Sequence, residues 1–249
     1  MLDADDDIRG YWVEMTSLML VTADSLLTRK SFVCCLNELL NDGKWTSTGD
    51  WSNLSISTIS LGSGHDRPPT VATGTPTRER EQSECEHSTD CLPGMGAIAM
   101  MYYRDYEMGK NKAFCYDMAG CRVCMDICKI YHAILDLALH GCTKKQILNK
   151  ESYANLNLCK EVKELFNSED ESSSPLITVL KKVLRVFNDS NNIEEGILML
   201  DENKTCALFG QLAGAYYGLT DIKEDWLDCL QSKEMLTDIT SRLLDKIRV

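Results

Sequence analysis

The stretch from Cys206 to Gly218 constrains the fold more than any other part of this sequence. It carries no ionisable side chain except one thiol and two phenols. Gly210 and Gly214 lie four residues apart, so on a helix they share one face. A glycine inside a helix costs about 1 kcal/mol relative to alanine, so we expect close backbone packing in return. The pattern predicts a buried central helix with Thr205 as its N-cap and Gly218 as its C-terminal cap.

The apolar residues of the remaining chain recur mostly at helical spacing. Alternation typical of a strand is confined to the segment from Leu54 to Leu61. We therefore predict an all-α protein. Thr143 begins a segment with capping-box spacing, which indicates one short helix. The longer helices are expected over 11–27, 30–40, 121–140, 175–187 and 227–247, beside an apolar stretch over 95–103.

The segment from Gly62 to Pro93 is polar and contains most of the prolines of the chain. Its composition is typical of a surface loop that is partly disordered. Two arrangements are compatible with it: a boundary between two domains, or a long loop within one domain. We predict a single domain over 1–249 that carries this loop over 62–93.

The composition excludes several classes of function. The formal net charge of −12 argues against a nucleic-acid surface, because a phosphate backbone would be repelled. No run of eighteen apolar residues occurs, so no membrane-spanning helix is expected. The N-terminus is acidic where a signal peptide would be basic, which indicates a cytoplasmic protein.

The twelve cysteines do not form the pattern of a disulfide framework, since most lie in apolar, helix-patterned segments. Free buried thiols are the preferred interpretation. A zinc site is the alternative, because three cysteines would share one helix face and others lie upstream. Its candidate ligands are Cys85, His87, Cys91, Cys115, Cys121, Cys124 and Cys128.

The four histidines lie near no serine or cysteine motif that would form a nucleophile–base pair. We expect His65 and His87 in loops, and His132 and His140 on or near a helix surface.

Carboxylates directly before the central helix are the best metal candidates by position. Asp201 and Glu202 would lie at a helix N-terminus, where the macrodipole favours negative charge and a hard cation could be held. Ordinary helix-start chemistry explains the same residues, and the neighbouring Lys204 weakens the metal assignment. Glu14 is a further charged residue in an unusual place, between Val13 and Met15.

The central stretch resembles a known family. Gly-Gln-Leu-Ala-Gly-Ala-Tyr-Tyr-Gly over 210–218, followed by Trp226, is similar to the C-terminal segment of the ADP-ribosylglycohydrolase superfamily. The segment 10–20 is similar to the N-terminal metal motif of that family, and 36–49, 92–105, 126–139 and 141–162 match it in order. The resemblance implies a compact orthogonal helical bundle. In active members it also implies a pair of magnesium ions and removal of ADP-ribose.

The ligand positions of the family do not carry the expected residues here. The threonine and two aspartates of the first motif fall on Val13, Glu14 and Met15, and only the following Thr16 matches. The aspartates and threonine of the C-terminal loop fall on Asp201, Asn203 and Lys204. Of these, Glu14 and Asp201 remain as possible metal ligands.

Other segments of the family pattern have also changed. The substrate-contacting loop falls on 88–91 without its glycines, a motif histidine falls on Ala119, and the Phe-Asp-Ile-Gly segment falls on 52–55. The usual first helix of the family has no counterpart in this sequence. The apolar helix faces, in contrast, are intact.

Three hypotheses follow. The first is a catalytically inactive family member with a binding or structural role, whose partner is a protein or an ADP-ribose-type ligand and which needs no cofactor. The second is an active hydrolase that removes ADP-ribose from modified proteins or small acceptors, with Mg²⁺ held by altered ligands. The third and weakest is a cysteine-rich zinc module. The lost ligands favour the first, because two adjacent magnesium ions need several carboxylates to neutralise them.

Overall fold

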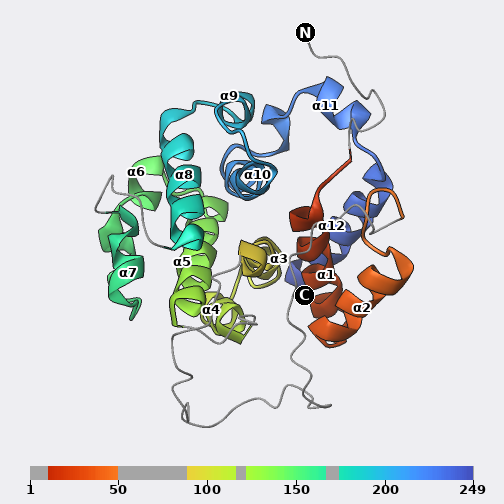
Figure 1. Cartoon of the computed structure of the whole chain (residues 1–249), viewed down its shortest axis with the longest axis horizontal. Helices are drawn as coiled ribbons and strands as arrows, with labels where there is room; N and C mark the ends of the chain where they lie inside the picture. The colour runs from red at the N-terminus through yellow and green to blue at the C-terminus, as the bar shows by residue number, and fades with distance from the viewer. Residues whose placement is uncertain (1–10, 50–88, 116–121, 167–173, 249) are drawn as a thin grey trace.

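The computed structural model describes residues 11–49, 89–115, 122–166 and 174–248. All regular structure in these ranges is helical, which confirms the all-α prediction. Short 3₁₀ helices lie at η2 (Thr89–Cys91), η3 (Lys150–Tyr153), η4 (Glu164–Phe166) and η5 (Leu219–Asp221). The α-helices are α1 (Glu14–Thr28), α2 (Phe32–Asp42), α3 (Gly94–Met101), α4 (Tyr106–Cys115), α5 (Arg122–Leu139), α6 (Lys144–Ile147), α7 (Lys160–Lys163), α8 (Pro175–Asp189), α9 (Ile193–Leu198), α10 (Asn203–Tyr217), α11 (Glu224–Cys229) and α12 (Lys233–Arg248) (Figure 1).

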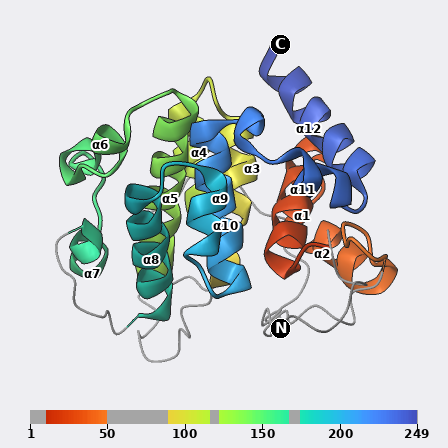
Figure 2. The same ribbon diagram turned by 90° about the horizontal axis from the view of Figure 1, so that it is seen from above.

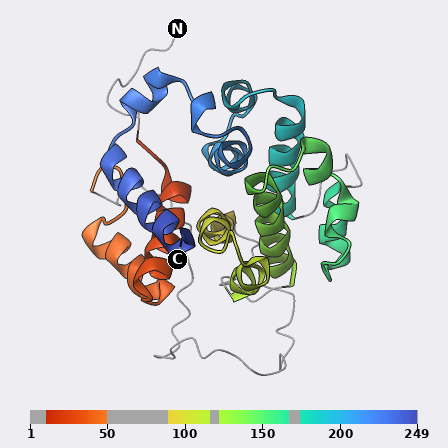
Figure 3. The same ribbon diagram turned by 180° about the vertical axis from the view of Figure 1, so that it is seen from behind.

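The helix formed by the central stretch, α10, lies in the middle of the bundle. It packs against α5, α8 and α9 and also contacts α1. Figure 2 shows α10 running beside α8. Figure 3, seen from behind, shows α12 crossing in front of α1, with α2 beside α1. The position of α10 agrees with the prediction of a central helix.

Two apolar clusters fill the bundle, and α1 and α3 contribute to both. The larger cluster is built mainly from α5, α8 and α10, with Tyr131, Phe187 and Phe209 as its largest side chains. The smaller cluster joins α1 and α2 to α12, and Trp45 closes it. Because α1 and α3 lie between the clusters, their positions are fixed from both sides.

The two glycines of the central helix have another role than expected. A Cβ atom at Gly210 or Gly214 would meet nothing within 4 Å, so the predicted close packing against them is wrong. Side chains of α10 instead approach glycines of other helices closely: a Cβ at Gly96 would lie 2.9 Å from Gln211 Oε1, and a Cβ at Gly196 would lie 2.0 Å from Phe209 Cζ.

The caps of α10 are partly as predicted. Gly218 ends the helix with φ 80°, and its N–H donates to the carbonyl of Gly214. The N-cap is Glu202 and not Thr205, whose hydroxyl donates to the Glu202 carbonyl from inside the first turn. Thr143 forms the predicted capping box with Gln146 at the start of α6.

The C-terminal segment differs from the prediction of one helix over 227–247. It forms two helices, α11 and α12, separated at Leu230 and Ser232, and Ser232 has φ 48°. A left-handed residue cannot continue an α-helix, so the leucine spacing spans a break. The sequence pattern also missed α4, which has almost no amphipathic character.

Several expectations lie wholly or partly outside the described residues. These are the possible strand over 54–61, the part of the polar loop over 62–88, and the cysteine side chains at 85, 115 and 121. Cys124 and Cys128 are buried thiols, as the thiol interpretation predicts. Within the described ranges, no helix is long and apolar enough to cross a membrane.

Candidate functional site

The start of α1 is held by tryptophan contacts. The backbone N–H of Trp12 donates to Ser47 Oγ at 3.2 Å, and its indole N–H lies 3.1 Å from Ser17 Oγ and 3.3 Å from the Trp45 carbonyl. Val13 is the extended N-cap residue and provides no side-chain capping bond. Met15, one residue into the helix, is fully buried. The conformation of this first motif is therefore determined by packing and by the hydrogen bonds of Trp12.

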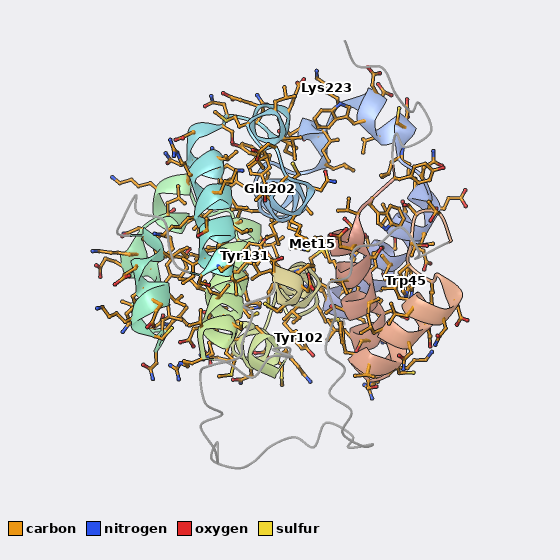
Figure 4. The ribbon with its side chains drawn as sticks, viewed as in Figure 1. Met15, Trp45, Tyr102, Tyr131, Glu202 and Lys223 are labelled. Carbon is orange, nitrogen blue, oxygen red and sulfur yellow. The ribbon has the colours of Figure 1, made fainter. Side chains whose placement is uncertain are left out.

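The side chain of Met15 lies where the helices of the site converge. It belongs to the apolar cluster that also contains Leu92, Met95 and Leu208, from the segment before α3, from α3 and from α10. Figure 4 shows Met15 and Tyr131 near the middle of the bundle, where α1, α3, α5 and α10 meet. A thioether there contributes apolar contacts and no hard oxygen ligand.

The loop before α10 is engaged by a lysine from α8. Lys182 Nζ contacts Asp201 Oδ1 and lies 3.9 Å from Glu202 Oε1. The hydrogen bond from Lys182 lowers the pKa of Asp201, and the same bond raises the pKa of Lys182. The Asp201 side chain is 79% exposed. This carboxylate therefore points to solvent with an ammonium as its neighbour.

A second ion pair links α10 to η2. Lys204 Nζ lies 4.0 Å from Asp90 Oδ1, and the Asp90 side chain is only 8% exposed. Lys204 is the second residue of α10, and η2 packs against α8. The starts of α3 and α10 are thus connected through opposite charges.

Gln211 fixes the position of α10 deeper in the bundle. Its amide nitrogen donates to the Pro93 carbonyl at 3.0 Å, and its Oε1 accepts from Tyr131 Oη at 3.3 Å. The same hydroxyl lies 2.8 Å from the Leu208 carbonyl. Since Pro93 directly precedes α3, this network ties α3, α5 and α10 together.

Magnesium does not fit the residues that meet here. Mg²⁺ requires nearly octahedral oxygen coordination, and a pair of ions requires several carboxylates. Val13 and Met15 supply no oxygen donor, and Lys204 brings a positive charge into the site. No group of three His, Cys, Asp or Glu side chains suited to a metal occurs among the described residues.

The two predicted ligands lie at different helix starts. Glu14 is the first residue of α1, and Asp201 precedes α10. Their assignment as metal ligands stays a prediction.

Of the histidine predictions, the one for His140 is confirmed and the one for His132 is wrong. His140 has a side chain that is 42% exposed and stacks on Tyr103 with ring centroids 4.4 Å apart. His132, expected near a surface, is only 1% exposed. It faces α4 where Gly109 provides room, since a Cβ there would lie 2.6 Å from His132 Nε2. His65 and His87 lie outside the described residues.

Sequence reasoning missed two side chains of this site. Lys182 lies nineteen residues before Asp201 on a separate helix, and no local spacing links them. Gln211 lies within the central stretch, but its partners Pro93 and Tyr131 lie on distant segments. Asp90 was located only by the order of the family's segments, which places it in the loop that contacts substrate.

These features define an all-helical protein in which ion pairs link the start of α10 to α8 and to η2, while Met15 at the start of α1 packs against apolar side chains of α3 and α10. Comparison with known proteins identifies the class. A sequence model described as ADP-ribosylglycohydrolase matches residues 2–249. The chain belongs to the ADP-ribosylglycohydrolase family, which confirms the resemblance.

The relatives found are distant. Two curated proteins named ADP-ribosylarginine hydrolase Tri1 match parts of the chain. The one from Pseudomonas putida (strain GB-1) is 25% identical over 132 residues, covering 49% of this chain and 36% of the relative. The one from Serratia proteamaculans (strain 568) is 31% identical over 88 residues, covering 33% and 24%. The matched regions thus cover about a third of one relative and about a quarter of the other.

A solved structure supports the fold. A chain from a structure titled "ADP-ribosylglycohydrolase-related protein complex" superposes with a TM-score of 0.68 over 95% of this chain and 82% of its own length. The two sequences are 21% identical, so this likeness concerns the fold alone.

Proposed function

We propose that this chain is a non-hydrolytic member of the ADP-ribosylglycohydrolase family that acts by binding a partner. The observation that supports this most is the burial of Met15 at a ligand position of the first motif. Its side chain is fully buried among apolar residues, where active members carry an aspartate.

The C-terminal loop supports the same proposal. Asn203 and Lys204 replace an aspartate and a threonine, and Asp201 is engaged by Lys182. Removing several hard oxygen ligands lowers the affinity for Mg²⁺, and a neighbouring ammonium opposes it further. Without the ions, no activated water is supplied for hydrolysis by the mechanism of the family.

Exposed apolar side chains beside this loop favour a binding role. Leu198 is 74% exposed and Met199 is 49% exposed, three and two residues before Asp201. Methionine and leucine at an accessible surface suit contact with the apolar groups of another protein. A protein partner is therefore preferred over a free ADP-ribose-type ligand.

The test is hydrolysis of ADP-ribosyl-arginine on a modified peptide, with millimolar Mg²⁺ and with EDTA. A Tri1 hydrolase serves as the positive control. We expect no release of ADP-ribose above the protein-free rate in either condition. Release that depends on Mg²⁺ would establish the alternative, an active hydrolase with altered ligands.

A further inference from the structure

Because the residues of this site do not suit Mg²⁺, its lysines need another explanation. We infer that the ammonium group of Lys204 stabilises the contact between η2 and the start of α10, and that this contact is stable without a divalent ion. The inference concerns the same site as the proposed function. Its readout is stability, so it can fail while the absence of hydrolysis holds.

The position of Lys204 on α10 is the first argument. A helix N-terminus carries a partial positive charge, so a lysine in the first turn is unfavourable there. Lys204 is the second residue of α10, and its side chain is 33% exposed. A lysine held in that place needs a nearby negative charge to offset the helix dipole.

The burial of Asp90 is the second argument. Its side chain is 8% exposed, and a carboxylate removed from water is costly unless opposite charge or hydrogen bonds compensate it. Lys204 Nζ, 4.0 Å away, provides that charge. Each residue of the pair therefore compensates an unfavourable feature of the other.

The surrounding contacts show what the pair holds together. Asp90 lies in η2, which leads through Pro93 into α3, and Gln211 from α10 binds the Pro93 carbonyl. On the outer side, Lys182 of α8 engages Asp201 and approaches Glu202. Two ammonium groups thus lie among three carboxylates contributed by η2 and by the loop before α10, next to α8.

The experiment is a double-mutant cycle on the full chain, followed by thermal unfolding. Its variants are Lys204→Met, Asp90→Asn and the combination of both. We expect each single change to lower Tm by about 3–6 °C, and the double variant to lose clearly less than the sum. The exposed pair Lys223–Glu194, 53% and 35% exposed, is the matched control and should show additive, small effects.

A second arm uses the unmodified protein and inorganic Mg²⁺ alone. Melts with MgCl₂, with NaCl of equal ionic strength and with EDTA should give the same Tm. A ligand that binds only the folded state raises Tm by mass action. Additive losses in the Asp90–Lys204 cycle, or a rise in Tm specific to Mg²⁺, would overturn the inference. The second arm tests the divalent-ion part of the inference even where a variant does not fold.

Discussion

The burial of His132 predicts how the protein responds to acid. Its imidazole is 1% exposed, and among the described residues neither ring nitrogen has a hydrogen-bond partner. Burial lowers the pKa of His132 from 6.5 to about 4. The ring lies under α4, near Gly109 and Tyr106, whose ring centroid is 5.7 Å away. Protonating the histidine therefore favours states in which α4 has separated from α5.

The direction of the change in stability with pH follows from proton binding. Because the pKa is lower in the folded protein, the unfolded chain binds the proton first as the pH falls. Stability is therefore lost below pH 6.5 and the loss is complete below about pH 4. With one pKa unit equal to 1.36 kcal/mol, the loss attributable to His132 is about 2 kcal/mol at pH 5.

The perturbation is His132→Leu, which keeps a similar volume and cannot be protonated. Denaturant unfolding, followed by tryptophan fluorescence at pH values from 7.5 to 5, gives the free energy of unfolding. We expect the difference between variant and wild type to shift by about 2 kcal/mol in favour of the variant at pH 5. His140→Leu is the control, because that ring is already accessible to solvent. Parallel pH profiles for wild type and His132→Leu would refute the reasoning.

Three further substitutions test the packing of the bundle by denaturant unfolding. Lys144 donates to two carbonyls at the end of α8 and lies over three aromatic rings, so Lys144→Met should cost about 2–3 kcal/mol. The exposed Lys145→Met is its control, and an equal loss would contradict the assignment. Asp126 is fully buried and accepts from two cationic side chains and one backbone N–H, so Asp126→Ala should cost about 3–5 kcal/mol; a loss below 1 kcal/mol would count against it. Gly196→Ala should cost about 1–3 kcal/mol through overpacking. Gly210→Ala, in contrast, should be neutral or stabilise the fold by up to about 1 kcal/mol. A larger loss at Gly210 than at Gly196 would contradict the packing of these two glycines.

The parts of the fold that could be predicted are those set by local patterns. The amphipathic helices α5 and α8 follow from apolar spacing, Pro175 begins α8, and Gly43 ends α2 in the left-handed region. Capping at Thr143 follows from four adjacent residues. Each of these features depends on side chains a few positions apart.

The parts that could not be predicted depend on contacts between distant segments. Gly210 and Gly96 differ in packing, although both are helical glycines, because only Gly96 faces the Gln211 side chain. His132 and His140 lie on the same amphipathic segment, and the burial of His132 comes from α4, a helix that spacing does not reveal. The ion pair of Asp90 with Lys204 joins residues more than a hundred positions apart.

The family pattern predicted more of the site than spacing could. It located the three segments that converge, and it identified Val13, Met15 and Lys204 as departures from the ligand set. The family pattern could not predict which contacts replace the metal ligands, because a lysine in the sequence does not show which carboxylate it neutralises.

The central claim is that the family fold is kept while its divalent-cation site is lost. Manganese binding, followed by electron paramagnetic resonance of the free ion, tests this most directly, since Mn²⁺ accepts the same oxygen ligands as Mg²⁺. A Tri1 hydrolase measured in parallel provides the comparison. We predict that the full chain leaves the free Mn²⁺ signal unchanged at protein concentrations where the hydrolase reduces it. Stoichiometric loss of the signal, with one or two ions bound per chain, would contradict the account.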